Sequence, residues 1–307
     1  MPVGSSVAGG VGRDIVADLS ARTADLSHSS SRSPMGDASA LMWAARASSD
    51  TVREIPYRTV DGRTMLLHVS PSREPVSSPV PTAVFYHGGG WVRGTWRQFL
   101  PQASCLNELG MLAVLVEYRM EGPVAAAADA VAAMRAVVEN ARDIGCDVER
   151  IVAIGGSAGG HLALATAVLD LPDTDPNHRP AALVLLNPVT NTCGEFPAGF
   201  GRRHFDNDDH ARRYSPVHHV GSRTPPVLVM HGTADTAVHH ENSVDFARAV
   251  MSHGGYAEVI LYPGQRHGFF NPRDGARRRP DDENVSYFDR TTWEMARFSR
   301  LAVIDKP

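Results

Sequence analysis

The sequence predicts an α/β protein in which a mostly parallel central sheet is covered by helices on both faces. Short apolar runs, typical of strands buried on both sides, alternate along the chain with longer segments that have helical periodicity. Before them, Asp61-Gly62 joins the segments 51–59 and 63–70, and this dipeptide is a strong signal for a β-hairpin turn. The expected architecture is therefore an N-terminal hairpin followed by alternating strands and helices.

After the hairpin, each expected strand is a short apolar run that ends at turn residues. These strands are Ala83–Tyr86, Met111–Tyr118, Arg150–Ile154, Ala181–Leu186, Val227–Met230 and Ala257–Leu261. Because the runs are apolar throughout rather than alternating, we expect both faces of the sheet to be covered.

The segments between these runs are expected to be helical. The helices are Phe99–Leu109, Val124–Arg142, His161–Leu169, Asn242–Ser252 and Asn284–Val303. The second is rich in alanine and carries one apolar helical face, which is made of Val124, Val131, Met134 and Val138. The last is expected to close the fold and to bury Phe288, Trp293 and Phe298.

Residues 51–307 are expected to form one domain, because no linker-like segment interrupts them. Within this domain, 190–223 is polar and rich in turn residues, and we interpret it as an insertion near the functional site. Residues 1–50 are rich in serine and glycine and contain no clear strand. They are either a loosely ordered extension or a small helical cap over the site, with Trp43 as its apolar anchor.

Charge and hydropathy exclude several classes of protein. The 30 basic and 34 acidic residues give a formal charge of −4, which argues against a nucleic-acid-binding face. No apolar run reaches the length of about 18 residues that crosses a membrane, and the N-terminus lacks the features of a signal peptide. Cys105, Cys146 and Cys193 cannot all pair, so we expect reduced thiols and a cytoplasmic location.

A glycine-rich turn after the apolar run 150–154 carries the candidate nucleophile. Residues 155–159, Gly-Gly-Ser-Ala-Gly, match the pattern G-x-S-x-G, which places a serine at the apex of a tight strand-to-helix turn. A plain glycine turn and a phosphate-binding loop are the alternatives. The glycine spacing fits a dinucleotide fingerprint poorly, and no Gly-Lys-Ser/Thr follows, which excludes a Walker loop. The pattern therefore favours Ser157 as a nucleophile.

A second glycine-rich turn, His87-Gly88-Gly89-Gly90, ends another apolar run. Glycines let backbone N–H groups converge on one point, as the oxyanion of a tetrahedral intermediate requires. We expect Gly88 and Gly89 to donate two of these groups, and Ala158, next to the serine, to donate the third. We interpret the His87 ring as a structural brace.

A serine nucleophile needs a base, and the base needs a carboxylate that orients it. Two loops follow expected strands downstream of Ser157, and they contain Asp235 and His267. Both lie where the carboxyl ends of parallel strands meet, which is where ligands bind in open α/β sheets. The order Ser157, Asp235, His267 therefore predicts a catalytic triad.

Other ionisable residues have plainer interpretations. The doublets 218–219 and 239–240 are histidines without a strand before them, and we expect them at the surface or in a cap. Asp206, Asp208 and Asp209 lie between His204 and His210, but this spacing matches no standard metal site, so we expect a solvated loop and no metal. The arginines within 273–279 are followed at once by acidic residues, which favours pairing on a surface loop over contact with an acidic substrate.

These motifs together resemble the α/β-hydrolase superfamily over residues 52–303, and within it the hormone-sensitive-lipase-like carboxylesterases and the bacterial acetyl-esterase and feruloyl-esterase group. The resemblance rests on 87–91, 157–163, 231–235 and 267–270. The lipase-like branch usually has Asp before the serine, where this chain has Gly156. It also usually continues Tyr-Arg-Leu-Ala-Pro-Glu, where this chain reads Tyr-Arg-Met-Glu-Gly at 118–122. The smaller acetyl- and feruloyl-esterase relatives are therefore the more similar.

The resemblance implies a serine hydrolase that cleaves a small-molecule carboxylic ester through an acyl-enzyme, without a cofactor. Trp91 and Phe269 are expected to line the pocket. A biosynthetic acyltransferase, thioesterase or cyclase with the same triad is the alternative, because pocket shape and dryness choose the acyl acceptor. A non-catalytic ligand-binding member of the fold is a weaker alternative, since all three triad residues are present. A homodimer is compatible with the sequence.

Overall fold

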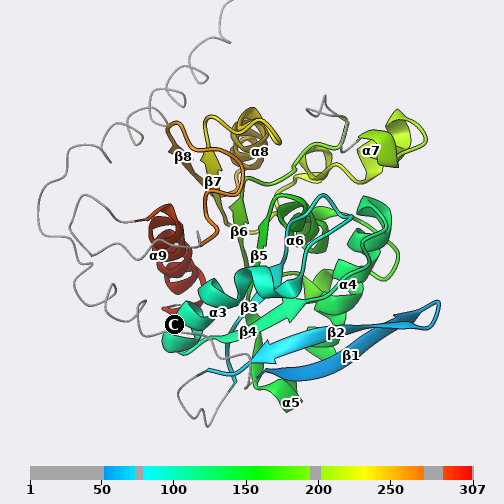
Figure 1. Ribbon diagram of the computed structural model, residues 1–307, viewed down its shortest axis with the longest axis vertical. Coiled ribbons are helices and arrows are strands. Elements are labelled where there is room, and N and C mark those ends of the chain that lie inside the picture. The colour runs from blue at the N-terminus through cyan, green and yellow to red at the C-terminus, as the bar shows by residue number, and fades with distance from the viewer. Residues whose placement is uncertain (1–51, 73–78, 194–201, 273–285, 306–307) are drawn as a thin grey trace, which may run out of the picture.

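One eight-stranded sheet, in the order β1-β2-β4-β3-β5-β6-β7-β8, organises the chain (Figure 1). The computed structural model describes residues 52–72, 79–193, 202–272 and 286–305. β1 pairs antiparallel with β2 and β2 antiparallel with β4, whereas every other pair is parallel. The strands are β1 Arg53–Val60, β2 Arg63–Ser70, β3 Val80–Tyr86, β4 Leu112–Val116, β5 Cys146–Gly156, β6 Ala182–Leu186, β7 Val227–Gly232 and β8 Ala257–Tyr262.

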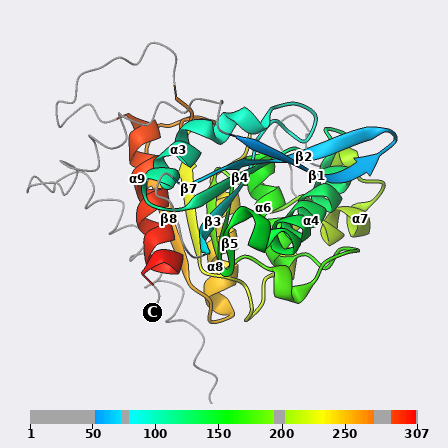
Figure 2. The same ribbon diagram turned by 90° about the horizontal axis from the view of Figure 1, so that it is seen from below.

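Helices cover both faces of this sheet, as Figure 2 shows from below. The larger helices are α3 Leu100–Glu108, α4 Pro123–Glu139, α6 Ala158–Val168, α8 Glu241–Ser252 and α9 Tyr287–Ser299. Two short ones are α5 Ala141–Ile144 and α7 Asp208–Arg213. The buried side chains of α4, α6 and α8 belong to one apolar cluster, and those of α3 and α9 belong to the other. The sheet therefore separates two cores.

Alternation along the strands divides their side chains between the two cores. In β3, Val84 and Tyr86 face the cluster of α4, α6 and α8, whereas Ala83 and Phe85 face the cluster of α3 and α9. Successive strand residues point to opposite faces, so an apolar residue is needed at every position when both faces are covered. This explains why the strand sequences are continuously apolar and confirms the predicted α/β architecture.

The boundaries of several elements differ from the sequence-based expectation. β5 begins at Cys146 rather than at 150, because Val80 of β3 pairs with Cys146 across a register shift. α6 begins at Ala158, directly after the serine turn, and α4 ends at Glu139 before the separate short helix α5. The ends of strands and helices depend on pairing and capping by residues that are neighbours in space. The apolar pattern of the sequence does not reveal these neighbours.

The closing helix α9 corrects the expected set of buried aromatics. Phe298 is buried as expected, but Phe288 and Trp293 are only half-buried. The inward face is instead set by Thr291, Met295 and Phe298, at the i, i+4 and i+7 positions of one helical stripe. Trp293 lies half a turn away from this stripe, so helical geometry turns it from the core.

The described part of 190–223 contains two 3₁₀ turns, Arg202–His204 and Pro216–His219, on either side of α7. Thr192 ties its start to α7, because its hydroxyl donates to the carbonyl of Ala211 at 2.6 Å. The cap expected within 1–50, including Trp43, and the charged segment 273–283 lie outside the described residues. Among the helices of the described ranges, none is long and apolar enough to cross a membrane.

A substitution at Gly159, in the first turn of α6, tests whether the close approach of α6 to β3 requires glycine at this position. Replacement by alanine in a helix ordinarily stabilises by about 1 kcal/mol, but here a Cβ atom would collide with the carbonyl of Tyr86 in β3. We expect Gly159→Ala to lower the free energy of unfolding by about 2–3 kcal/mol, because the packing clash outweighs the helix propensity. Denaturant unfolding measures this.

Gly221→Ala is the matched control for this prediction, because a Cβ atom there meets nothing within 4 Å and the residue does not need a positive φ. Its unfolding free energy should stay within about 0.5 kcal/mol of the parent. Equal stability of the two variants would contradict the close approach of α6 and β3.

Candidate active site

Ser157 occupies the apex of the turn between β5 and α6. Its φ of 56° lies in the left-handed region, which is strained for a residue with a side chain. Its N–H donates to the carbonyl of Leu186 at 2.8 Å, which fixes the turn to β6. A Cβ atom on Gly155 would collide with the backbone of Gly159, so the turn requires glycine there. The local sequence thus exposes the hydroxyl at the carboxyl edge of the sheet.

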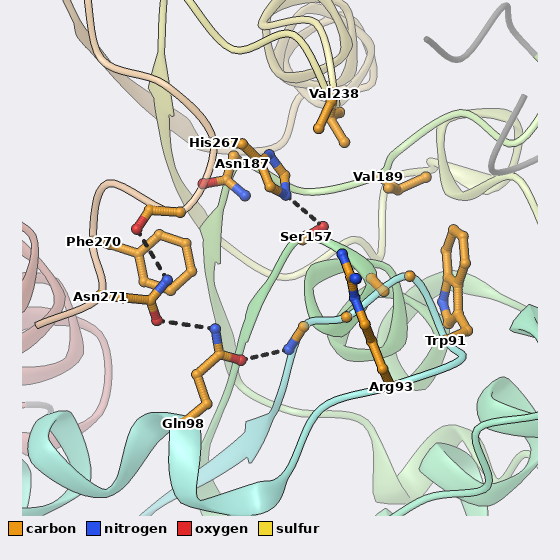
Figure 3. A pocket seen from close by; sticks show the side chains of 16 residues that line it. Trp91, Arg93, Gln98, Ser157, Asn187, Val189, Val238, His267, Phe270 and Asn271 are labelled. Carbon is orange, nitrogen blue, oxygen red and sulfur yellow. Dashed lines mark hydrogen bonds between the residues drawn. The ribbon is translucent and has the colours of Figure 1, made fainter. Parts of the chain in front are cut away.

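The structure brings the three residues of the predicted triad together. His267 Nε2 lies 2.9 Å from Ser157 Oγ, and His267 Nδ1 lies 2.7 Å from Asp235 Oδ2. Figure 3 shows His267 directed at Ser157. The three residues follow β5, β7 and β8, so the parallel sheet itself collects them at one edge.

Asp235 is held by four donors. Its Oδ1 accepts from the N–H groups of Ala237 at 2.8 Å and Val238 at 3.0 Å. Its Oδ2 accepts from His267 and, at 3.2 Å, from His231 Nε2. Burial alone would raise the pKa of Asp235, but the hydrogen bonds from the two histidines and from Val238 hold this pKa far below its usual value. The carboxyl group is therefore ionised at neutral pH.

His231 is a fully buried histidine to which the sequence assigned no role. Its Nε2 lies 3.0 Å from the carbonyl of Val238 as well as near Asp235, and both of these groups only accept hydrogen bonds. Nε2 therefore carries a proton, and Nδ1 is hydrogen-bonded to the Ser243 hydroxyl at 2.6 Å. The side chain thus anchors the acid to α8.

The loop after β3 partly corrects the expected oxyanion donors. The N–H of Gly88 donates to Gln98 Oε1 at 2.6 Å, so this group is occupied. Gly89 and Gly90 line the cavity with φ values of 123° and 63°, and within the described chain neither N–H has an acceptor. Ala158 is the first residue of α6, where a helix leaves its N–H groups free. The available donors are Gly89, Gly90 and Ala158 rather than Gly88.

Gln98 and Asn271 form an amide link between the two loops of the site. Gln98 accepts from Gly88 and donates from Nε2 to Asn271 Oδ1 at 3.0 Å. Asn271 in turn donates from Nδ2 to the carbonyl of Gly268 at 3.0 Å, next to His267. Figure 3 shows these hydrogen bonds of Gln98 and Asn271 to one side of Ser157. No motif marks these two amides, so the sequence could not single them out.

His87 braces the same loop, in agreement with the sequence-based interpretation. Its ring stacks on Tyr118 with centroids 4.2 Å apart, and its Nδ1 donates to the carbonyl of Gly88 at 2.8 Å. The hydroxyl of Tyr118 donates to the carbonyl of His87 at 2.7 Å. Burial lowers the pKa of His87, which keeps the ring neutral.

A cavity of about 190 Å³ opens over Ser157. Trp91 lines it as expected, but Phe269 does not, and Phe270 takes its place. Gly268, with φ of 73°, turns the chain after His267, so Phe269 packs in the core against Tyr262, with ring centroids 4.9 Å apart. The expected position was therefore wrong by one residue.

Asn187, also in the lining, was missed by the sequence. It is fully buried with φ of 37°, and neither atom of its amide group has a partner in the described structure. Like Ser157 and Trp91, it is a non-glycine residue of the cavity with positive φ. Such backbone strain concentrates at functional sites.

The acidic residues near 204–210 serve local pairs. Asp206 contacts His210 Nδ1 at 3.2 Å, and Asp208 contacts Arg202 at 2.9 Å. Over the ranges that the structure describes, no group of three histidine, cysteine or acidic side chains could hold a metal ion.

Comparison with known proteins gives a family and several esterases. A family model described as the alpha/beta hydrolase fold matches residues 83–271, which is more than half of the chain. The chain is 30% identical over 244 residues to esterase LipQ of Mycobacterium tuberculosis, covering 70% of this chain and 56% of LipQ. It is 26% identical over 260 residues to an ethyl acetate hydrolase of Pseudomonas putida, covering 76% and 80%.

Other matches place these similarities in context. A probable isoprenylcysteine alpha-carbonyl methylesterase of Arabidopsis thaliana is 26% identical over 62% of this chain, but the match spans only 46% of that protein. The chain thus spans about half the length of the first curated relatives that it matches.

Solved structures match over more of their length. Propionate-bound esterase 2 of Thermogutta terrifontis has a TM-score of 0.72 and 29% identity, covering 85% of this chain and 98% of that one. The form of that esterase phosphorylated by paraoxon has a TM-score of 0.71 and 29% identity, with 84% and 98% covered. From the matched residues and the geometry of the site, the chain belongs to the family with the alpha/beta hydrolase fold.

Proposed function

We propose that this protein is a serine esterase that hydrolyses a carboxylic ester of a small molecule through an acyl-enzyme. One observation carries the proposal: the hydrogen-bonded series Ser157, His267, Asp235 opens on a cavity beside the free N–H groups of Gly89 and Gly90. A nucleophile, its base, an orienting acid and an anion-binding loop are the parts that acyl transfer needs. The similarity to several esterases supports it.

Asp235 sets the tautomer of the base. Its ionised oxygen only accepts, so His267 Nδ1 carries the proton and Nε2 presents a lone pair to the Ser157 hydroxyl. As Oγ attacks the ester carbonyl, Nε2 takes the hydroxyl proton and then gives it to the departing alkoxide. Water next attacks the acyl-enzyme, again through Nε2, and releases the acid. One ester and one water thus give one acid and one alcohol.

The N–H groups of Gly89, Gly90 and Ala158 are proposed to hold the oxyanion. One such donor contributes about 3 kcal/mol to transition-state stabilisation when it is fixed in advance. The glycine loop is fixed by its own hydrogen bonds, since the N–H of Arg93 donates to the carbonyl of Gly89 at 3.2 Å. The His87 ring, which stacks on Tyr118, also holds the carbonyl of Gly88 in this loop.

The walls of the cavity suit an apolar acyl group. Trp91, Val189 and Phe270 line it, and these side chains are proposed to contact the acyl chain. Propionate and butyrate occupy the Thermogutta esterase, which is consistent with a short chain here. The acyl group of the natural substrate is therefore proposed to be small.

Ser157→Ala is expected to lower kcat for 4-nitrophenyl butyrate by at least about 10³-fold, because the nucleophile is lost. Paraoxon should add a diethylphosphoryl group to Ser157 of the parent protein and none to the variant, as mass spectrometry of the peptides will show. Ser252→Ala, an exposed serine in α8, is the control and should keep both activity and labelling. Hydrolysis by Ser157→Ala at the parent rate would refute the proposed nucleophile.

Gln98 is proposed as a positioning residue that holds the oxyanion loop and the His267 loop in register. Gln98→Ala should lower kcat about tenfold while KM changes less, because the transition state depends more than the ground state on placement of the donors. Steady-state kinetics of Gln98→Ala, Asn271→Ala and the double variant will measure this. The double variant should lose no more than the worse single variant, since both remove one link. Fully additive losses would contradict the link.

The depressed pKa of Asp235 predicts a pH dependence of stability. A carboxyl group with a lower pKa in the folded state contributes stability that is fully present above its unfolded pKa of about 3.9 and is lost as pH falls below it. The difference in unfolding free energy between the parent and Asp235→Asn should therefore shrink from pH 6 to pH 3. Urea unfolding at several pH values checks this. A difference that stays constant over the range would contradict it.

A further inference from the structure

Arg93 brings a positive charge to a cavity with few charged groups. Among the described residues that line the cavity, Arg93 is the one with a permanent charge, and no aspartate or glutamate is among them. The remaining polar side chains are Gln98, Ser157, Asn187, His267 and Asn271. The lining that a substrate meets therefore carries one permanent cation and no carboxylate, because the ionised Asp235 lies buried behind His267.

The glycine loop fixes the position of Arg93. A Cβ atom on Gly89 would collide with the carbonyl of Arg93 and would lie 3.2 Å from its Cγ, so the arginine stem lies directly over Gly89. Gly94 follows with φ of 115° and packs against the His87 ring. Figure 3 shows the side chain extending from this loop toward Ser157. The guanidinium group is thus directed to the mouth of the catalytic cavity.

The guanidinium group of Arg93 has no partner in the described structure, whereas neighbouring arginines do. Arg97, four residues later, lies over the Trp96 ring at 4.2 Å. Arg119 makes two hydrogen bonds of 2.8 Å to the buried carboxylate of Asp129. Arg93 instead keeps all five of its donors available.

We propose that Arg93 binds a carboxylate carried by the ester substrate and makes the enzyme selective for anionic esters over neutral esters of the same size. This inference rests on the proposed esterase function. A guanidinium group matches a carboxylate with two parallel hydrogen bonds, which a neutral alkyl chain cannot form. Because Arg93 is exposed, solvent screens the attraction and the preference will be moderate.

Paired esters measure this preference on either side of the scissile bond. Monoethyl glutarate and ethyl valerate compare a charged with a neutral acyl chain, and butyryloxyacetate and propyl butyrate compare a charged with a neutral alcohol. Acid release at constant pH gives kcat/KM for each. The parent protein should prefer the charged member of one pair, and that pair shows whether the carboxylate belongs to the acyl group or the alcohol.

Arg93→Gln should lower the charged-to-neutral ratio of kcat/KM in that pair by about tenfold, and Arg93→Glu should lower it further. Arg97→Gln removes the same charge from the same segment but outside the cavity, so this control should keep the parent ratio. The parent preference should also weaken as salt is raised from about 0.05 M to 0.5 M.

Two results would overturn the inference while leaving the esterase function intact. One is a parent enzyme that hydrolyses neutral esters but shows no preference for either charged ester. The other is a loss in Arg93→Gln that is equal for the charged and neutral members, which would assign Arg93 to the oxyanion loop instead. Failure of the parent to hydrolyse every ester would reject the proposed function itself.

Discussion

The close approach of β5 and α6 is the constraint on which the rest of the site depends. Gly155 and Gly159 leave no room for side chains, and this allows the chain to reverse within two residues. The reversal forces Ser157 into a left-handed conformation and lifts its hydroxyl above the sheet. It also places the first N–H groups of α6 beside that hydroxyl. One steric requirement therefore sets both the proposed nucleophile and part of the proposed anion-binding surface.

The parallel strands then bring the other side chains of the site together, because the loops that carry them follow neighbouring strands. β3, β5, β7 and β8 end at the same edge, so the loops after them deliver the glycine loop, the serine, the acid and the base to one place. The contacts between these loops are polar and local. Gln98 and Asn271 connect the first loop to the last, while His231 ties the acid to α8. The sheet gives position, and the side chains give the finer alignment.

The sequence predicted what depends on backbone geometry and strand order, and it missed what depends on a particular side-chain direction. Glycine spacing singled out Ser157, and strand context singled out Asp235 and His267, three side chains that the structure places within hydrogen-bond distance of one another. It named Gly88 as a donor, since nothing in the sequence reveals that Gln98 occupies this N–H. It placed Phe269 in the pocket, because the turn at Gly268 decides which neighbour faces inward. The sequence likewise did not predict that Arg93 lines the cavity, because this depends on how the loop folds over Gly89.

The shared carboxylate of Asp235 has a further consequence for how the protein can be handled. If the imidazole of His267 were removed, the acid would still be held by His231 and by the amides of Ala237 and Val238. The chain would then lack its base without acquiring an orphaned buried charge. Such a form would retain the cavity and the glycine loop without the proposed base, and so offers a protein with which an intact ester could be captured and identified.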